Sequence, residues 1–232
     1  MRRSLLALLL IGVVAPACAP IDRPGPLLSW DFEASEALTA DRIGHGHEVH
    51  SEGHWRSAPG RVGRSAALED ASVEVAIDLL PAWTTAQWVQ LNALPTEDFV
   101  FITSHGNGTI SYTGWALAIA ADGTPHAIVE GGTSAQETLL PAPDPMVPGR
   151  WTHLASSWDG GVLDLYVDGQ LVADTDVPFT AIPDGGLPFV VGWDANQERR
   201  ALDGQLDEVA LWDEALDPSH IAALARHGDA SR

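Results

Sequence analysis

The chain has 232 residues, of which 32 are acidic and 12 basic, so its formal net charge is −20. All twelve basic residues are Arg; the absence of Lys excludes a phosphate-loop lysine and Schiff-base chemistry. The charge argues against a nucleic-acid partner, and the single Cys excludes an internal disulfide or a multi-cysteine zinc site.

The first residues have the pattern of an export signal. Arg2 and Arg3 precede an apolar run over residues 5–14, which is too short to span a bilayer, and small residues lead to Cys18. We predict a signal peptide over 1–17, lipidation of Cys18, as in bacterial lipoproteins, and a tether over 18–26. The expected location is the bacterial cell envelope, with the lipid as the sole membrane contact. The alternative is free secretion after cleavage near Ala17 or Ala19.

Downstream of the tether, apolar residues recur with period two, which predicts β-strands rather than helices. Asp122-Gly123 and Asp168-Gly169 lie between alternating segments and predict tight hairpin turns. In chain order, the predicted strands cover residues 72–77, 85–91, 115–120, 126–129, 151–158, 162–167, 170–173, 189–192 and 205–212.

One segment has helical features. Asp217 suits an N-cap, Pro218 suits the first helical position, and Gly228 suits the end of the helix. A proline-rich stretch over 141–148 predicts an extended loop before the strand at 151. We therefore predict an all-β fold, an antiparallel two-sheet sandwich over 27–226 with one short C-terminal helix and a tail over 227–232.

Five motif segments follow one another along the chain: 28–33 (LSWDFE), 41–47 (DRIGHGH), 60–68 (GRVGRSAAL), 151–155 with 165–169 (WTHLA, LYVDG), and 204–212 with 215–218 (GQLDEVALW, ALDP). They occur in the order found in one family, the laminin-G-like, concanavalin A-like jelly-roll domains. Each segment is a weak signal alone, but together they resemble that family over residues 27–226. The family includes carbohydrate-binding modules, adhesion domains and sandwiches fused to enzymes.

The resemblance implies a structural calcium ion. Its ligands would be the Asp41 and Asp207 carboxylates and backbone carbonyls near Gly44 and His47, since calcium takes oxygen ligands. The alternative is a metal-free loop in which Asp41 accepts backbone amides.

The same comparison argues against catalysis. Jelly-roll glycan hydrolases carry Glu-x-Asp-x-Glu on one strand, which places alternate carboxylates on one face. Here the corresponding segment has Gln205, Asp207, Glu208 and Val209, so the adjacent carboxylates should face opposite sides. We predict no catalytic residues.

Two loops have the composition of a glycan-binding rim, in which aromatic rings stack on sugars beside polar groups. The predicted function is therefore a non-catalytic recognition module with carbohydrate as the expected ligand. The alternatives are a protein-adhesion or structural envelope domain and, with less support, a glycan hydrolase; for Trp193, packing against a strand is equally consistent. The predicted rim residues are His105, Asn107, Tyr112, Trp115, Trp193, Asn196 and Arg199.

Overall fold

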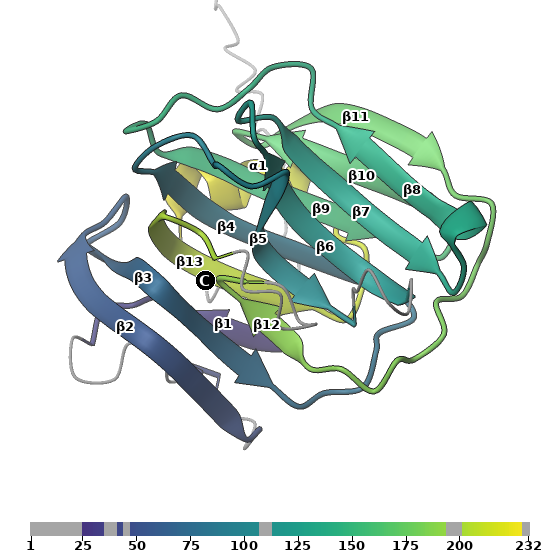
Figure 1. Cartoon of the computed structure of the whole chain (residues 1–232), viewed down its shortest axis with the longest axis horizontal. Coiled ribbons are helices and arrows are strands. Elements are labelled where there is room, and N and C mark those ends of the chain that lie inside the picture. Colours follow the sequence, from purple (N-terminus) through teal and green to yellow (C-terminus); the bar gives the residue numbers. More distant parts are fainter. Residues whose placement is uncertain (1–24, 35–40, 44–46, 107–112, 194–200, 229–232) are drawn as a thin grey trace, which may run out of the picture.

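The computed structural model describes residues 25–34, 41–43, 47–106, 113–193 and 201–228. Thirteen strands, one 3-10 turn (η1, Ser134–Gln136) and one helix (α1, Pro218–His227) lie in these residues (Figure 1). No helix within them is long and apolar enough to cross a membrane. The strands are β1 (Leu28–Trp30), β2 (Val49–Pro59), β3 (Arg64–Val75), β4 (Trp83–Leu91), β5 (Phe99–His105), β6 (Thr113–Ala120), β7 (Pro125–Gly131), β8 (Glu137–Pro141), β9 (Thr152–Trp158), β10 (Val162–Val167), β11 (Gln170–Asp176), β12 (Phe189–Val191) and β13 (Gly204–Trp212).

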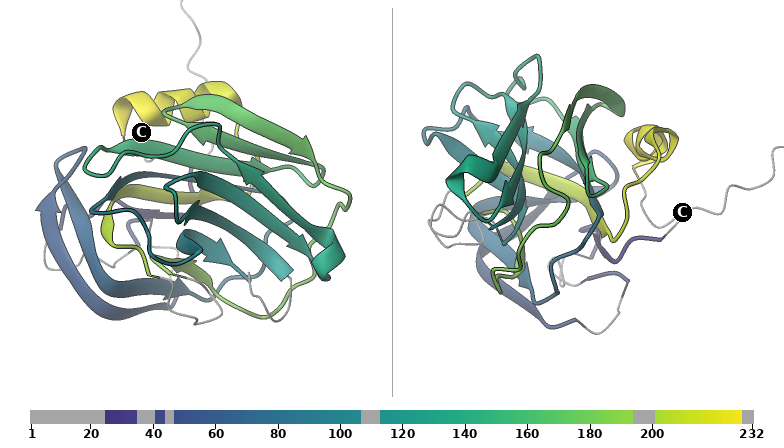
Figure 2. Two further views of the ribbon diagram at one scale, coloured as in Figure 1. Left: turned by 45° about the horizontal axis from the view of Figure 1, so that its top comes forward. Right: turned by 90° about the vertical axis from the view of Figure 1, so that its right-hand side faces the viewer.

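The strands form one antiparallel ladder in the order β11-β10-β9-β4-β13-β3-β12-β5-β6-β7-β8, with β1 on β13 and β2 on β3. The ladder doubles over, so that β5–β8 lie in front of β9–β11 and β4 (Figure 1). Seen from the side, the helix α1 makes a third layer outside β9–β11 (Figure 2). The predicted antiparallel β-sandwich with a short C-terminal helix is confirmed.

The alternation of side chains between the two faces of a β-strand explains why apolar residues recur with period two in the sequence. On β6, Trp115, Leu117 and Ile119 join the central core, whereas Ala116 and Ala118 belong to a separate buried cluster on the other face. The core between the two layers is apolar and aromatic, and burial of these side chains is the main stabilising contribution to such a fold.

The helix covers the outer face of the second layer. Ile221 packs in one buried cluster with Tyr166 of β10 and Trp212 of β13. The Asp217 carboxylate accepts the Ser219 amide at 2.7 Å, and Gly228 (φ 69°) ends the helix, donating its N–H to Leu224 O. The predicted helix is therefore confirmed at both ends.

The two predicted Asp-Gly turns are confirmed, but β2, β5 and β8 were not predicted. In β2, exposed polar residues occupy both faces along most of its pairing with β3, so no alternation marks it. Strand β5 is almost wholly buried and therefore also lacks alternation. Strand β8 is an edge strand that ends at Pro141, where the predicted extended loop begins.

Candidate functional site

Four strands, β2, β3, β12 and β5, begin or end in register at one end of the sandwich, and β6 lies beside them. Val49 pairs with Val75, Val75 with Phe189, Phe189 with His105, and His105 with Trp115. Because these residues form one cross-strand row, the segments leaving β3 and entering β2 and β12 emerge beside one another. Loops distant in sequence are thereby brought to the same edge.

These segments enclose an open cleft of about 750 Å³. It is formed mainly by residues 76–80, which follow β3, and by residues 184–188, which precede β12. Its wall combines apolar and polar groups, as expected of a binding site for a small molecule. The apolar side chains include Leu27, Ile77, Leu80, Leu187 and Pro188, and the polar ones are His47, Asp78 and Asp184.

The cleft carries two exposed carboxylates, Asp78 and Asp184. Asp184 Oδ1 accepts the Gly186 amide at 2.8 Å, which orients this carboxylate within its turn. No Arg is among the described residues that line the cleft. Its electrostatic character is therefore negative.

His105 lies beneath this cleft with 0% exposure. Its imidazole meets the rings of Trp115 (6.1 Å) and Phe189 (6.3 Å) edge to face. Burial lowers the pKa of His105 to about 4, although the Ile77 backbone and the charges of Asp184 and Asp78 act in the opposite direction. The ring is therefore neutral at neutral pH and does not cancel the charge of the cleft.

The structure corrects the predicted aromatic rim. His105 and Trp115 are fully buried in the cross-strand row, and Trp193 is 3% exposed and packs with Val190. The alternative reading of Trp193 as a packing residue is the one observed. The alternation of Trp115 with Leu117 and Ile119 is the signal that should have placed it in the core. The remaining predicted rim residues, Asn107, Tyr112, Asn196 and Arg199, lie outside the described residues, as does Cys18.

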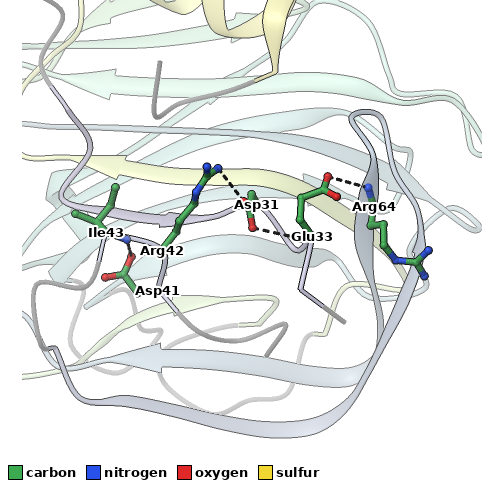
Figure 3. Close-up of polar contacts among 6 residues, drawn as sticks. All are labelled: Asp31, Glu33, Asp41, Arg42, Ile43 and Arg64. Atoms are coloured by element: carbon green, nitrogen blue, oxygen red, sulfur yellow. Dashed lines mark hydrogen bonds and ion pairs between the residues drawn. The ribbon is translucent and has the colours of Figure 1, made fainter. Parts of the chain in front are cut away.

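The residues expected to bind calcium are placed in three different settings. Asp41 Oδ1 accepts the amides of Ser29 (3.0 Å) and Ile43 (3.2 Å). His47 lines the cleft, and Gly44 lies outside the described residues. Figure 3 shows Asp41 on one side of the Asp31–Arg42 ion pair (2.8 Å), with Glu33 and Arg64 on the other.

Asp207 lies on the Glu33 side of this region. Its Oδ2 accepts the Val62 amide at 2.9 Å, and Glu33 Oε1 accepts the Arg64 amide at 3.0 Å. Asp207 has 0% exposure, and burial raises its pKa to about 7, with the charge of Glu33 adding to the shift.

The fit to calcium is incomplete. Asp207 Oδ1 is buried and has no hydrogen-bond partner among the described residues, so it is an oxygen that a cation could use. However, no three acidic or His side chains in the described ranges converge on one point. The calcium site therefore stays a prediction.

The two adjacent carboxylates of β13 have different surroundings. Asp207 faces the turn at Gly60–Val62, whereas Glu208 lies beside Trp88 and His153 near the helix end. The β13–β4 register shifts here, and Glu208 has φ 50°. This arrangement does not form the paired carboxylates of a glycan hydrolase.

Comparison with known proteins identifies relatives of this chain. The sequence profile of the concanavalin A-like lectin/glucanases superfamily (Laminin_G_3) matches residues 64–222. The pentraxin-related protein PTX3 of Mus musculus is 26% identical over 156 residues, 62% of this chain and 39% of PTX3. PTX3 of Homo sapiens is 32% identical over 98 residues, 37% of this chain and 26% of that protein. The chain thus spans well under half the length of either relative.

Solved structures share the fold at low identity. Domain 4 of AbnA, a GH43 extracellular arabinanase from Geobacillus stearothermophilus in complex with arabinotriose, has a TM-score of 0.69 and 20% identity. The alignment covers 87% of this chain and all of that domain. The binding domain of Paraclostridial Mosquitocidal Protein 1 has a TM-score of 0.69 and 14% identity over 87% of this chain and 52% of that one. The binding domain of Botulinum Neurotoxin DC in complex with SialylT has a TM-score of 0.63 and 14% identity over 87% of this chain and 51% of that one.

Proposed function

Because the chain belongs to the concanavalin A-like lectin/glucanases superfamily, we propose that it is a non-catalytic recognition module that binds carbohydrate. The observation that carries this proposal is the open cleft at the convergent strand ends, between residues 76–80 and 184–188. Apolar walls can pack against the C–H face of a sugar ring, and carboxylates can accept hydrogen bonds from its hydroxyls.

The compared structures support a binding role. Domain 4 of AbnA is described in complex with arabinotriose, and the neurotoxin binding domain in complex with SialylT. The sequence identity of these two structures to this chain is too low to assign either ligand to it. They support carbohydrate as a class, whereas the cleft supplies a location on this chain.

We place the module outside the cytoplasm, held to a membrane through lipidated Cys18. This part of the proposal rests on the signal-like sequence over residues 1–17. Leu27 at the cleft lies nine positions after Cys18, a reach of at most roughly 30 Å. Expression in a bacterial host should give a detergent-extracted membrane protein, and Cys18→Ser should abolish lipid labelling and release the protein. Equal fractionation of both forms would contradict the anchor.

A glycan array with a blocked-cleft variant tests the carbohydrate site. Ala76 is exposed and lines the cleft, so Ala76→Trp should fill it without disturbing the core. Ala93, exposed in the loop after β4 at the opposite end, supplies the matched control Ala93→Trp. We expect glycan binding by the wild type and Ala93→Trp, and at least about a tenfold loss in Ala76→Trp.

Three results would count against the proposal. Equal binding by Ala76→Trp and the wild type would move the glycan site away from the cleft. Absence of binding to every glycan, together with capture of a defined envelope protein, would favour the adhesion alternative. Release of reducing ends from a bound glycan would show an enzyme.

A further inference from the structure

We infer that the cleft selects a saccharide that carries a protonated amine. This inference rests on the proposed function, because it assigns the ligand class of the same cleft. It follows from the charges around the cleft, from the buried residue beneath it and from the chemistry of its wall.

The two carboxylates of the cleft come from neighbouring loops. Val75 of β3 pairs with Phe189 of β12, so Asp78 and Asp184 extend beyond the same end of two adjacent strands. Both line one cleft and both are exposed. A ligand held between these loops therefore meets two negative charges.

No cation of the described chain is paired with these carboxylates. The ion pairs among the described residues join Arg42 to Asp31, Arg56 to Glu69 and Arg150 to Asp168. Arg61 lies 4.6 Å over the Trp88 ring, away from the cleft. Since the chain has no Lys and no Arg lines the cleft among the described residues, a cationic ligand would meet these carboxylates without displacing a described Arg.

The residue beneath the cleft does not supply that charge either. His105 has 0% exposure, and its ring has the Ile77 backbone as a hydrogen-bonding neighbour. It lies near enough to Asp78 and Asp184 to experience both charges, but the rings of Trp115 and Phe189 keep it in apolar surroundings and neutral. The carboxylates therefore remain uncompensated from below.

An aminosugar matches both components of this wall. Its ammonium group donates up to three hydrogen bonds, and bonds to a carboxylate are strengthened by charge. Its ring presents a C–H face to Ile77, Leu80 and Leu187. A sugar bearing a carboxylate or sulfate would be repelled, whereas a neutral sugar would lose only the ionic contribution.

Oligosaccharides that differ at one position test the inference. The probes are β-1,4-linked oligomers of glucose, N-acetylglucosamine and glucosamine, together with an array that carries other hexoses in hydroxyl, acetamido and amino forms. Affinity is measured by calorimetry at pH 6 at low and high salt. We expect the amino form to bind about tenfold or more tightly than its hydroxyl and acetamido counterparts, with the preference reduced by salt.

Two variants connect the preference to the carboxylates. Asp78→Asn and Asp184→Asn should each reduce amino-form affinity about tenfold and leave hydroxyl-form affinity within about twofold. Asp144→Asn, in the exposed proline-rich loop at the opposite end, should change neither. Unchanged melting temperatures establish that the variants are folded.

Each of the other possible outcomes would contradict the inference. Equal or tighter binding of hydroxyl or acetamido forms overturns the inference and leaves the proposed function standing. An amine preference that survives in both Asp variants also overturns it. Binding of neutral sugars that requires added calcium overturns it, because the carboxylates would then face a metal. Absence of binding to every glycan overturns both proposals.

Discussion

Trp83 and Trp115 stack across the interior with their ring centroids 4.1 Å apart and their planes 17° from parallel. Trp83 lies on β4 and Trp115 on β6, so this pair joins the two layers of the sandwich. Both side chains have 0% exposure. Trp115, which was predicted to contact a ligand, therefore contributes to the stability of the fold instead.

Replacing Trp115 by Ala should destabilise the fold by about 3–5 kcal/mol, because it removes a large buried side chain and leaves a cavity. Leu171→Ala is the control, since Leu171 is 47% exposed and should cost no more than about 0.5 kcal/mol. Urea unfolding followed by tryptophan fluorescence and circular dichroism measures both. A Trp115→Ala variant that keeps its stability but loses glycan binding would restore Trp115 to the binding surface.

His105 should make the fold sensitive to acid. Its pKa is about 4 in the folded chain against an ordinary 6.5, so between these values the unfolded chain binds more protons. The free energy of unfolding contributed by this residue therefore falls as the pH drops from 6.5 towards 4. His105→Phe should reduce this slope, and His50→Phe, at an exposed position on β2, should not.

His153 contributes to the same acid sensitivity. It is buried beside Trp88, and burial lowers its pKa to about 3, so some slope should persist in His105→Phe. Stability measured in urea at several pH values tests this expectation. Identical slopes in the wild type and His105→Phe would show that His105 is not buried as described.

Asp207 should make the stability of the fold change with pH in the opposite direction to His105 and His153. Its folded pKa of about 7 lies above the ordinary 3.8, so between these values the folded chain binds more protons and its stability falls as the pH rises. Asp207→Asn should therefore be more stable than the wild type at pH 8, by up to about 4 kcal/mol, and similar to it near pH 4. The exposed Asp213→Asn is the control. A variant that is less stable at both pH values would mean that the ionised carboxylate is favourable in the fold.

Calcium provides an independent test of the same residue. If the resemblance to the family extends to a structural calcium ion, the full chain should melt at a higher temperature in calcium than in chelator, because a ligand bound only by the folded form stabilises it. Asp207→Asn should remove this difference, since Asp207 Oδ1 is a buried carboxylate oxygen without a hydrogen-bond partner in the described chain. Magnesium is the control cation. Equal melting temperatures for the wild type in calcium and chelator would contradict the site.

Most of the strands could be predicted from the amino-acid sequence, because a half-buried strand must alternate apolar and polar side chains, as residues 162–167 do. The helix could be predicted as well, because Asp217 and Gly228 act through local backbone geometry. The sequence did not reveal β2, with polar residues on both faces, or β5, which is buried almost throughout, since neither strand alternates.

The position of the candidate site depends on the three-dimensional fold and could not be predicted from the sequence. His105 resembles a loop residue in the sequence, yet its pairing with Phe189 and Trp115 places it in the interior. Asp78 and Asp184 belong to distant segments and have no distinctive neighbours in the sequence. They share a cleft because Val75 pairs with Phe189, and such long-range registers depend on side-chain packing across the whole sandwich rather than on any local pattern.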